Sequence, residues 1–374
     1  MEKLNVLVTG GAGFIGSHLV DALVERGHQV RVLDALVEQV HGGAEPRYLN
    51  PKAEFVRADV CDREAVDRAL EGVEVVYHKA AEVGVGQSMY EIERYVRAND
   101  MGTAVLLEAV VRRRPQVRKL VVASSMSIYG EGAYACGSCS RMAHPKLRPA
   151  SQLLERRWEV ECERCGSELR PVATNEDKPL FPTSVYAVSK QDQEQYCLVV
   201  GRAYNIPSVA LRYFNVYGTR QALSNPYTGV CAIFSSRLLN DERPVIFEDG
   251  EQTRDFVHVR DIVRANLLAL ETDRADYQSV NIGTGRPISI REVALMLARG
   301  LGKDIEPEIV ARYREGDIRH CVADITRARD LLGYEPTVTL EDGIPELLSW
   351  VREQEAADQV TRATAELESR QLVR

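Results

Sequence analysis

The chain has 374 residues, enough for one large domain or two modest ones. Hydrophobic residues make up 45% and charged residues 27%, as in ordinary globular proteins. The net charge of −8 gives no overall basic field that would favour nucleic acid or an anionic membrane. We see neither a secretory signal nor an apolar run of about 18 residues that could span a bilayer. We therefore expect a cytoplasmic protein that binds neither nucleic acid nor a membrane.

Short apolar runs alternate with helical patterns through the first half of the chain. Residues 4–9 are predicted to form a buried strand, and apolar residues then recur at helical spacing until Gly27. A second strand, 29–33, ends on Asp34. Further strands are predicted at 54–57, 73–77, 119–123 and 207–212. This alternation predicts an α/β fold of Rossmann type, a doubly wound parallel sheet with helices on both faces.

Three regions depart from this rhythm. Residues 134–180 are polar, contain Cys, Arg and Pro, and lack a clean apolar period, so we interpret them as an insertion. From 219 to 350 the pattern loosens, which predicts a smaller mixed α/β region that mainly binds substrate. The charged tail, 351–374, favours a helix that is solvated or packed against a partner. The nucleotide-binding domain would then comprise 1–133 and 181–218.

A glycine-rich turn, Gly10 to Gly16 (GGAGFIG), lies between the first strand and the first helix. Glycine lets the backbone approach a pyrophosphate, and the helix N-terminus presents free N–H groups to the phosphates. Asp34 can accept hydrogen bonds from ribose hydroxyls and would repel a 2′-phosphate. The pattern predicts an NAD site rather than an NADP site, with Arg31 as the one nearby feature against it. The alternatives are a structural turn and a solvated aspartate.

Three further segments are 124–130 (SSMSIYG), 186–190 (YAVSK) and 212–218 (RYFNVYG). Together with the glycine turn, and in the same order, they resemble the extended short-chain dehydrogenase/reductase family, specifically its NAD-dependent nucleotide-sugar epimerases and dehydratases. The resemblance covers nearly the whole chain except the insertion and the tail. It implies an enzyme that binds NAD and acts on a nucleotide-diphosphate sugar.

Tyr186 and Lys190 are the predicted catalytic pair, and their spacing of four places them on one helix face. A free tyrosine has a pKa of about 10, so lowering it by about three units needs roughly 4 kcal/mol of stabilisation from the ammonium and a nicotinamide cation. The resemblance implies that Ser125 binds the reacting hydroxyl with help from Ser127, and that Lys190 holds the nicotinamide ribose. Outside this context, a surface helix pair would be the simpler interpretation.

The resemblance also implies contacts for residues elsewhere, with packing positions or surface charges as the alternative interpretation. The implied cofactor-binding residues are Gly10, Gly13, Phe14, Ile15, Gly16, Asp34, Asp59, Val60, Ala80, Ala81, Asn99, Tyr186 and Lys190. The implied substrate-binding residues are Ser125, Asn215, Arg254, Arg314 and Asp317. Arginine suits a diphosphate because its guanidinium donates two parallel hydrogen bonds.

The residues that follow Ser125 bear on the type of reaction. Dehydratases of this family typically have Asp-Glu there, whereas this chain has Met126 and Ser127. The resemblance therefore implies a 4-epimerase, an isomerase that oxidises C4 to a 4-keto intermediate and returns the hydride to the opposite face. The alternatives are a UDP-hexose 4-epimerase, another nucleotide-sugar epimerase or oxidoreductase, and a catalytically idle NAD-binding scaffold or sensor.

The insertion contains two C-x-x-C pairs, Cys136 with Cys139 and Cys162 with Cys165, separated by 22 residues. This pattern suits a zinc-ribbon-like site with four thiolates, although the gap is slightly longer than usual. Such a zinc would be structural, because four protein ligands leave no position for a catalytic water. A redox pair, coincidence and nucleic-acid binding are the alternatives, and we treat His144 as a bystander.

The insertion and segment 220–230 (RQALSNPYTGV) resemble a cysteine-bearing subgroup related to dTDP-L-rhamnose 4-epimerases. This implies dTDP-L-rhamnose and dTDP-6-deoxy-L-talose as substrates. Family members commonly dimerise through a four-helix bundle, here formed by 95–114 and 186–204. The apolar residues that would permit a homodimer are Val105, Leu106, Ala109, Val110, Tyr196, Val199 and Val200.

Overall fold

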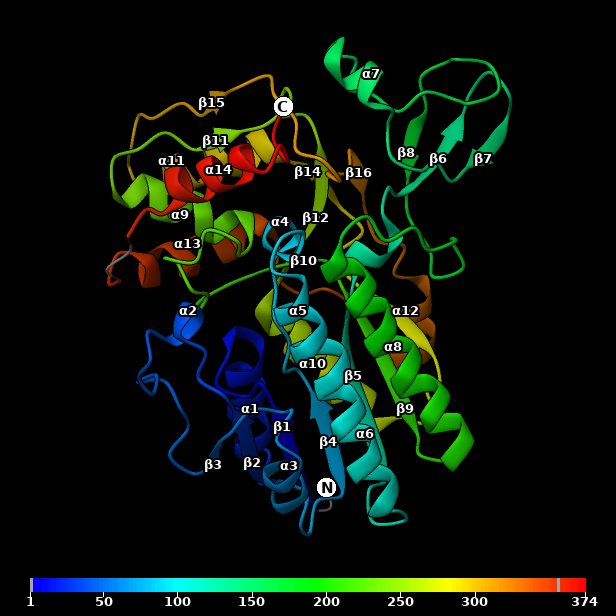
Figure 1. Cartoon of the computed structure of the whole chain (residues 1–374), viewed down its shortest axis with the longest axis vertical. Helices are drawn as coiled ribbons and strands as arrows, with labels where there is room; N and C mark the ends of the chain where they lie inside the picture. Colours follow the sequence, from blue (N-terminus) through cyan, green and yellow to red (C-terminus); the bar gives the residue numbers. More distant parts are fainter. Residues whose placement is uncertain (1–2, 355–356) are drawn as a thin grey trace.

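The computed structural model describes residues 3–354 and 357–374. Its centre is a seven-stranded parallel sheet in the order β13-β9-β5-β4-β1-β2-β3 (Figure 1). The strands are β1 (Asn5–Thr9), β2 (Gln29–Asp34), β3 (Glu54–Arg57), β4 (Val75–His78), β5 (Lys119–Ser125), β9 (Ser208–Tyr213) and β13 (Ser279–Ile282). The predicted doubly wound parallel sheet is confirmed.

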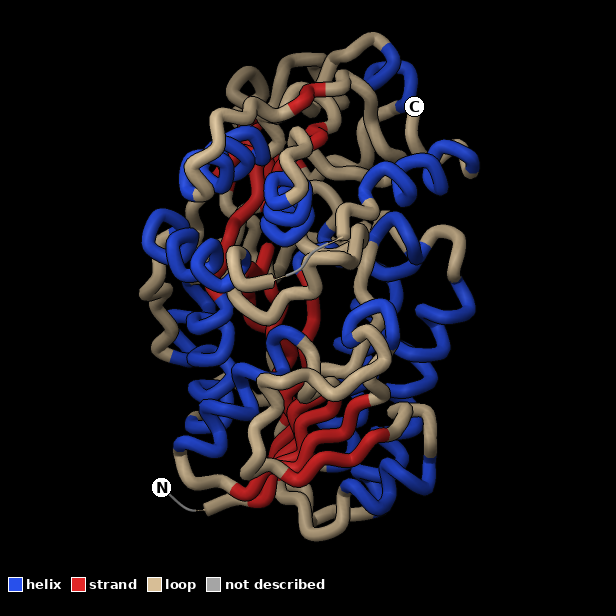
Figure 2. The backbone as a smooth tube through the Cα atoms, turned by 90° about the vertical axis from the view of Figure 1, so that its left-hand side faces the viewer, coloured by secondary structure: helices blue, strands red, loops and turns tan. Residues whose placement is uncertain are grey.

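Helices cover both faces of this sheet (Figure 2). Successive strand residues point to opposite faces, so Val6 and Val8 pack in one core and Leu7 in the other. The first core is completed by α1 (Phe14–Glu25), α10 (Val259–Glu271) and α12 (Thr326–Leu332). The second is completed by α3 (Arg63–Ala69), α6 (Gly102–Arg112) and α8 (Val185–Tyr204). Ahead of α6 lie α5 (Ile92–Tyr95) and the π-helical turn η1 (Val96–Met101).

A second, smaller layer with its own apolar core lies above the sheet. Its strands are β10 (Asn215–Tyr217), β11 (Val245–Ile246), β12 (Thr253–His258), β14 (Pro287–Ser289), β15 (Glu308–Ile309) and β16 (His320–Cys321). Its helices are α9 (Val230–Leu239), α11 (Ile290–Gly300) and α13 (Leu340–Val351). The region 219–350 therefore contributes to both layers. Strand β13 lies within it but hydrogen-bonds to β9 of the large sheet, and helices α10 and α12 pack on that sheet.

The insertion forms a small antiparallel sheet, β7-β6-β8, that projects at the upper right of Figure 1. Its elements are β6 (Ala133–Cys136), β7 (Arg141–Ala143), α7 (Ala150–Leu154) and β8 (Arg170–Val172). The buried apolar core contains only Tyr134, Cys136, Val160 and Leu169, with Cys139, Ala143 and Cys162 beside it. So small a core needs other bonds to hold it together.

The tail differs from the expectation of a solvated or partner-packed helix. Helix α14 (Val360–Ser369) packs against its own chain, because Ala363 and Leu367 form a buried apolar face. Residues 355–356 of the tail lie outside the described residues. Three short elements complete the fold: α2 (Glu38–His41), α4 (Val85–Ser88) and η2 (Met126–Tyr129). In the described ranges no helix combines the length and apolarity needed to cross a bilayer.

The expected dimer residues need a correction. Val105, Leu106, Ala109 and Val110 are at most 4% exposed, because this face of α6 covers the sheet. They cannot form an interface between subunits. Tyr196 and Val199 of the expected set are exposed, and Val200 is half-buried. The other exposed apolar side chains of α5, η1 and α8 are Ile92, Val96, Met101, Val188 and Tyr204.

Candidate active site

The glycine turn has room for backbone only. Gly10 has a φ of 68°, and a Cβ there would lie 2.6 Å from the backbone nitrogen of Ala80. A Cβ at Gly16 would lie 2.1 Å from the Gly10 carbonyl oxygen. Helix α1 begins at Phe14, and the N-cap Gly13 has no side chain to cover the first N–H groups. The turn therefore fits a pyrophosphate that approaches the backbone at this helix end.

Asp34 is fixed at the end of β2, next to the turn. Its Oδ2 accepts a hydrogen bond from Ala12 N at 3.0 Å, and its Oδ1 accepts one from Leu36 N at 2.9 Å. A carboxylate held here suits ribose hydroxyls. The guanidinium of Arg31 donates instead to Glu54 and to the carbonyl oxygens of Ala69 and Glu71, at 2.7–2.9 Å. Arg31 thus points away from the place where a 2′-phosphate would bind.

Asn99 is buried and has little capacity left for a cofactor. Its Nδ2 donates to Glu82 O and to Ser189 Oγ, and its Oδ1 accepts from Glu82 N at 2.8 Å. Because an amide nitrogen has two hydrogens, both donors are used within the protein. Asn99 therefore fixes the loop after β4 against α8.

The other implied cofactor residues surround the same end of the sheet. Ala80 N donates to Thr9 Oγ1 at 3.3 Å, and Ala81 follows it in the same loop. Asp59 Oδ1 accepts from Cys61 N at 2.8 Å, while Val60 is buried against Gly102. The glycine turn, Asp34 and this loop are thus brought together as the sequence predicts.

Tyr186 and Lys190 lie on the buried face of α8. The helix begins after Ser184, whose Oγ accepts from Ala187 N, and Tyr186 N donates to Ser88 Oγ at 3.0 Å. Ser125, at the end of β5, accepts a hydrogen bond from Ser127 Oγ at 2.9 Å. Parallel strand ends and the start of α8 therefore assemble the predicted serine, tyrosine and lysine at one edge of the sheet.

Burial shifts the pKa of both Tyr186 and Lys190. Burial raises the pKa of Tyr186, and the hydrogen bond with Ser125 opposes the rise. Burial also lowers the pKa of Lys190 to about 8. Lys190 Nζ donates to Gln193 Oε1 at 2.7 Å. Ionisation of Tyr186 to a phenolate therefore requires a positive charge close to its hydroxyl.

A buried network behind Lys190 was missed by the sequence reasoning. Gln193 Nε2 donates to Thr103 Oγ1 at 2.9 Å, and the ring of His78 lies between Thr103 and Thr9 at 2.9 and 2.8 Å. The network links Lys190, the predicted catalytic lysine, to the strand that precedes the glycine turn. Its only signal in the sequence is the spacing of three between Lys190 and Gln193 on one helix face.

Of the predicted substrate residues, Asn215, Arg254, Arg314 and Asp317 line one cavity of about 330 Å³, and Ser127, the neighbour of Ser125 by hydrogen bond, lines it as well. The buried Oδ1 of Asn215 has no hydrogen-bond partner among the described residues, so it is free to bind a ligand. Arg254 donates to three backbone carbonyls at 2.7–2.9 Å. Arg314 donates to Asp317 Oδ2 at 2.7 Å and stacks over Phe247.

Comparison with known proteins agrees with this geometry. The model of the NAD dependent epimerase/dehydratase family matches residues 6–151, and the GDP-mannose 4,6 dehydratase model matches 166–347. A dTDP-L-rhamnose 4-epimerase from Burkholderia thailandensis is 36% identical over 95% of this chain and 96% of its own. The chain belongs to the NAD-dependent epimerase/dehydratase family.

Two solved structures of this family show the same overall arrangement. UDP-glucose 4-epimerase from Thermotoga maritima with UDP-glucose is 34% identical, has a TM-score of 0.76, and covers 94% of this chain and 99% of its own. UDP-glucuronic acid 4-epimerase from Bacillus cereus with UDP-glucuronic acid and NAD is 30% identical, with the same TM-score and coverage.

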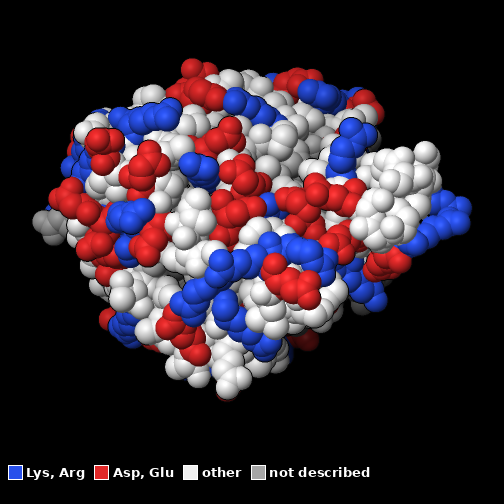
Figure 3. All heavy atoms as spheres, turned by 90° about the horizontal axis from the view of Figure 1, so that it is seen from above, with Lys and Arg blue, Asp and Glu red and all other residues white. Residues whose placement is uncertain are grey.

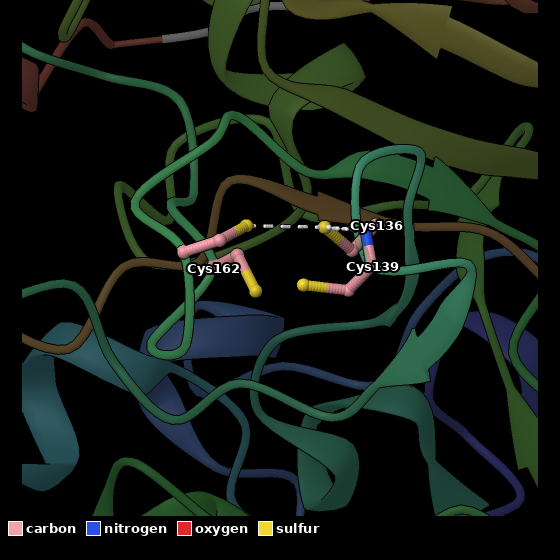
Figure 4. A group of neighbouring side chains, drawn as sticks. Cys136, Cys139 and Cys162 are labelled. Atoms are coloured by element: carbon pink, nitrogen blue, oxygen red, sulfur yellow. Dashed lines mark hydrogen bonds between the residues drawn. The ribbon is translucent and has the colours of Figure 1, made fainter.

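The cysteines of the insertion form a cluster: Cys136 and Cys139 lie within the first matched family segment, and Cys162 and Cys165 lie between the two segments. The four Sγ atoms lie within 4.8 Å of one another, and the Sγ atoms of Cys136 and Cys165 are 3.6 Å apart. Figure 4 shows the labelled side chains pointing toward one another from facing loops. Tetrahedral zinc with Zn–S bonds of about 2.3 Å places sulfurs about 3.8 Å apart, so the cluster fits zinc. His144 is not in this group.

Proposed function

We propose that this family member is an NAD-dependent nucleotide-sugar 4-epimerase. The observation that carries the proposal is a cavity lined by Ser127, Asn215, Arg254 and Arg314, in which Ser127 is linked by hydrogen bonds through Ser125 to Tyr186. Met126 and Ser127 replace the acid and base that elimination of water would need, which favours epimerisation over dehydration. The named relatives above are themselves 4-epimerases.

The residues of the chain divide the chemistry between them. Tyr186 accepts the proton of the C4 hydroxyl, which Ser125 orients by a hydrogen bond. Bound NAD would supply a reversible hydride acceptor beside C4, held by the glycine turn and Asp34, so the reaction would involve no net oxidation. Arg254 and Arg314 hold the diphosphate while the flat 4-keto sugar turns over. Tyr186 then returns its proton to the C4 oxygen, on the sugar with inverted configuration.

We further propose dTDP-L-rhamnose and dTDP-6-deoxy-L-talose as the substrate pair. The Burkholderia relative and segment 220–230 support this choice. UDP-hexose is the second candidate, supported by the similarity to the Thermotoga structure with UDP-glucose. A catalytically idle scaffold would have no need for the intact Ser125, Tyr186 and Lys190.

A panel of dTDP-, UDP-, GDP- and ADP-sugars, with NMR detection of C4 inversion, tests the reaction and the base. We expect Tyr186→Phe to lose about 10²- to 10⁴-fold in kcat, the usual contribution of a positioned acid–base group. Tyr204→Phe, at the exposed end of the same helix, is the matched control and should remain active. Near-full activity of Tyr186→Phe would contradict the proposed mechanism.

We propose a structural zinc ion on Cys136, Cys139, Cys162 and Cys165. Protein purified without chelators should contain about one equivalent, and Cys162→Ser should lose the metal and increase proteolysis of the insertion. Cys61→Ser, outside the cluster, is the control. Less than about half an equivalent in the wild type contradicts the proposal. A thiolate site suits a reducing compartment, which supports a cytoplasmic location.

Nucleic-acid binding by the insertion is not favoured. Basic and acidic side chains are intermixed over the upper face of the molecule (Figure 3), so this face offers no continuous basic surface for phosphates. We also propose a homodimer formed through α5, η1 and α8, which contact one another and carry the exposed apolar side chains given above.

A further inference from the structure

The C-terminal segment lies against the substrate cavity. Ala363, Leu367 and Leu372 line the same cavity as Asn215 and Arg254, and Ala363 and Leu367 are buried. In Figure 1, α14 lies in the upper layer, and residues of α9 line the same cavity. None of the mechanism above uses this segment.

One side of α14 reaches the element that supports the catalytic tyrosine. Leu367 packs against Gly86 so closely that a Cβ there would lie 3.3 Å from Leu367 Cδ2. Gly86 belongs to α4, whose Ser88 Oγ accepts the hydrogen bond from Tyr186 N. Leu367 is therefore placed at the end of the cavity where the sugar must react.

The chain end after α14 reaches the opposite end of the cavity. Tyr313 N donates to Arg374 O at 2.9 Å, Arg374 N donates to Tyr313 O at 3.0 Å, and Glu315 N donates to Leu372 O at 2.9 Å. This antiparallel pairing flanks Arg314, a predicted diphosphate ligand. The tail thus spans both ends of the ligand site.

A polar cluster holds α14 in this position. The hydroxyls of Tyr90 and Tyr227 lie 2.6 Å apart, and each lies within 3.0 Å of Glu366 Oε2. Hydrogen bonds from Tyr227 and Tyr90 lower the pKa of Glu366, so the carboxylate stays charged at neutral pH. The guanidinium of Arg370 stacks over Tyr90 at 4.2 Å. The cluster joins the tail to both walls of the cavity.

Apolar side chains line the cavity where α14 closes it: Val85 and Met89 lie on either side of Gly86, against which Leu367 packs, and Met126 precedes Ser127. Ser127, Thr183 and Ser184 add hydroxyls to this lining but no charge. The cationic side chains among the described lining residues are Arg254 and Arg314, which the proposed function places at the diphosphate. A carboxylate on the sugar would enter this part of the cavity without a cation to pair with, which is costly.

We propose that α14 forms the sugar-side wall of the pocket and that Leu367 makes it selective for a nucleotide 6-deoxyhexose over a nucleotide hexuronate. The inference rests on the proposed function and adds the element and the side chain that would select the sugar. The methyl group of a 6-deoxyhexose gains from apolar contact, whereas a carboxylate loses its hydration there.

Binding measurements test the wall without requiring turnover. We expect wild-type holoenzyme to bind a dTDP-6-deoxyhexose on the order of 100-fold more tightly than the matching dTDP-hexuronate. Leu367→Arg should reduce this ratio by about 10-fold or more, and Leu367→Ala should raise the relative affinity for the bulkier dTDP-hexose. Ala365→Arg adds the same charge to the exposed face of α14 and should leave the ratio unchanged.

NAD content and thermal unfolding of each variant show whether it is folded. If Leu367→Arg is not folded, the binding ratios of Leu367→Ala test the proposal. Unchanged affinity ratios in folded Leu367 variants would contradict the proposed role of Leu367, even if C4 inversion is intact. A wild type that binds both sugars equally also overturns it. Selective binding without C4 inversion would refute the proposed reaction and leave the wall standing.

Discussion

Glu159 connects the insertion to the strand that follows the substrate-binding loop. Its carboxylate lies 3.1 Å from His320 Nε2 and accepts from Arg319 Nε at 2.9 Å. Burial would raise the pKa of Glu159, but the hydrogen bonds from His320 and Arg319 outweigh burial and lower the pKa to about 2. A depressed pKa means that the ionised carboxylate stabilises the folded state.

The lowered pKa of Glu159 determines how the stability of the protein depends on pH. The stabilisation by Glu159 is complete above the pKa of about 4.5 that the group has when unfolded, and it is lost as pH falls toward 2. After allowance for partial exposure, we expect Glu159→Gln to lower the free energy of unfolding by about 1–2 kcal/mol at pH 7 and by less at pH 3. Urea unfolding at the two pH values measures this, with exposed Glu163→Gln as the control. An equal loss at both pH values would contradict it.

For individual residues, the sequence predicts which side chains form the site better than it predicts the hydrogen bonds that they make. The spacing of Tyr186 and Lys190 on one helix face follows from the helical repeat, and the structure places both on the buried face of α8. The donation from Lys190 to Gln193 could not be predicted, because it depends on which of several nearby acceptors the folded chain brings within reach. The same holds for Asn99, whose partners Glu82 and Ser189 come from two other elements.

At the scale of elements, the insertion is joined to the substrate layer by a buried ion network. Arg148 donates to both carboxylate oxygens of Glu248 at 2.8 and 3.0 Å, and to Asp317 O at 3.3 Å. Glu248 follows Phe247, on which Arg314 stacks. The insertion thereby supports the loop that we assign to the nucleotide.

Removal of Arg148 tests this connection. Arg148→Ala removes one of the two buried arginines that pair with Glu248 and leaves Arg319 Nη1 at 3.1 Å, so we expect a loss of about 1.5–3 kcal/mol in the free energy of unfolding, the range for a hydrogen bond to a charged group. We also expect a higher KM for the nucleotide sugar with a smaller change in kcat, because Asp317 and Arg314 are less well held. Arg157→Ala, an exposed arginine of the same insertion, is the control. Denaturant unfolding and steady-state kinetics measure these two effects. A loss of stability and a rise in KM no larger than those of Arg157→Ala would refute the connection.

The tail shows the limit of prediction for whole elements. Its composition favours a helix, and α14 is one. Its position could not be predicted, because Glu366 meets Tyr90 across 276 residues of sequence. A charged, amphipathic pattern is compatible with a solvated helix, a partner's surface or the chain's own cavity.

At the scale of the whole molecule, regular repetition made the large sheet predictable. Six parallel strands appear as short apolar runs with helices between most of them, and the structure confirms their positions. The seventh, β13, was not predicted as part of this sheet. It follows β10, α9, β11 and β12 of the smaller layer, so chain order alone does not show that it returns to β9.

The exposed apolar stripe on α5, η1 and α8 bears on the assembly of the whole molecule. Ile92 is 51% exposed and Val199 57% exposed, and the elements that carry them pack side by side. Apolar side chains grouped in this way are typical of an interface, whereas single exposed ones are ordinary. A second copy that presents the same face can bury the stripe by twofold symmetry.

Charge placed on this stripe should separate the subunits. We expect the wild type to have the mass of a dimer at micromolar concentration in sedimentation or light scattering, and Ile92→Glu with Val199→Glu to have the mass of a monomer, because two carboxylates would be buried without partners. Met142→Glu alters an equally exposed apolar residue in the insertion, away from the stripe, and should leave the dimer intact. Because α8 also carries Tyr186 and Lys190, NAD content is measured on the same samples, and retained NAD shows that the monomer is folded. A monomeric wild type, or a double variant that remains a dimer, contradicts this interface.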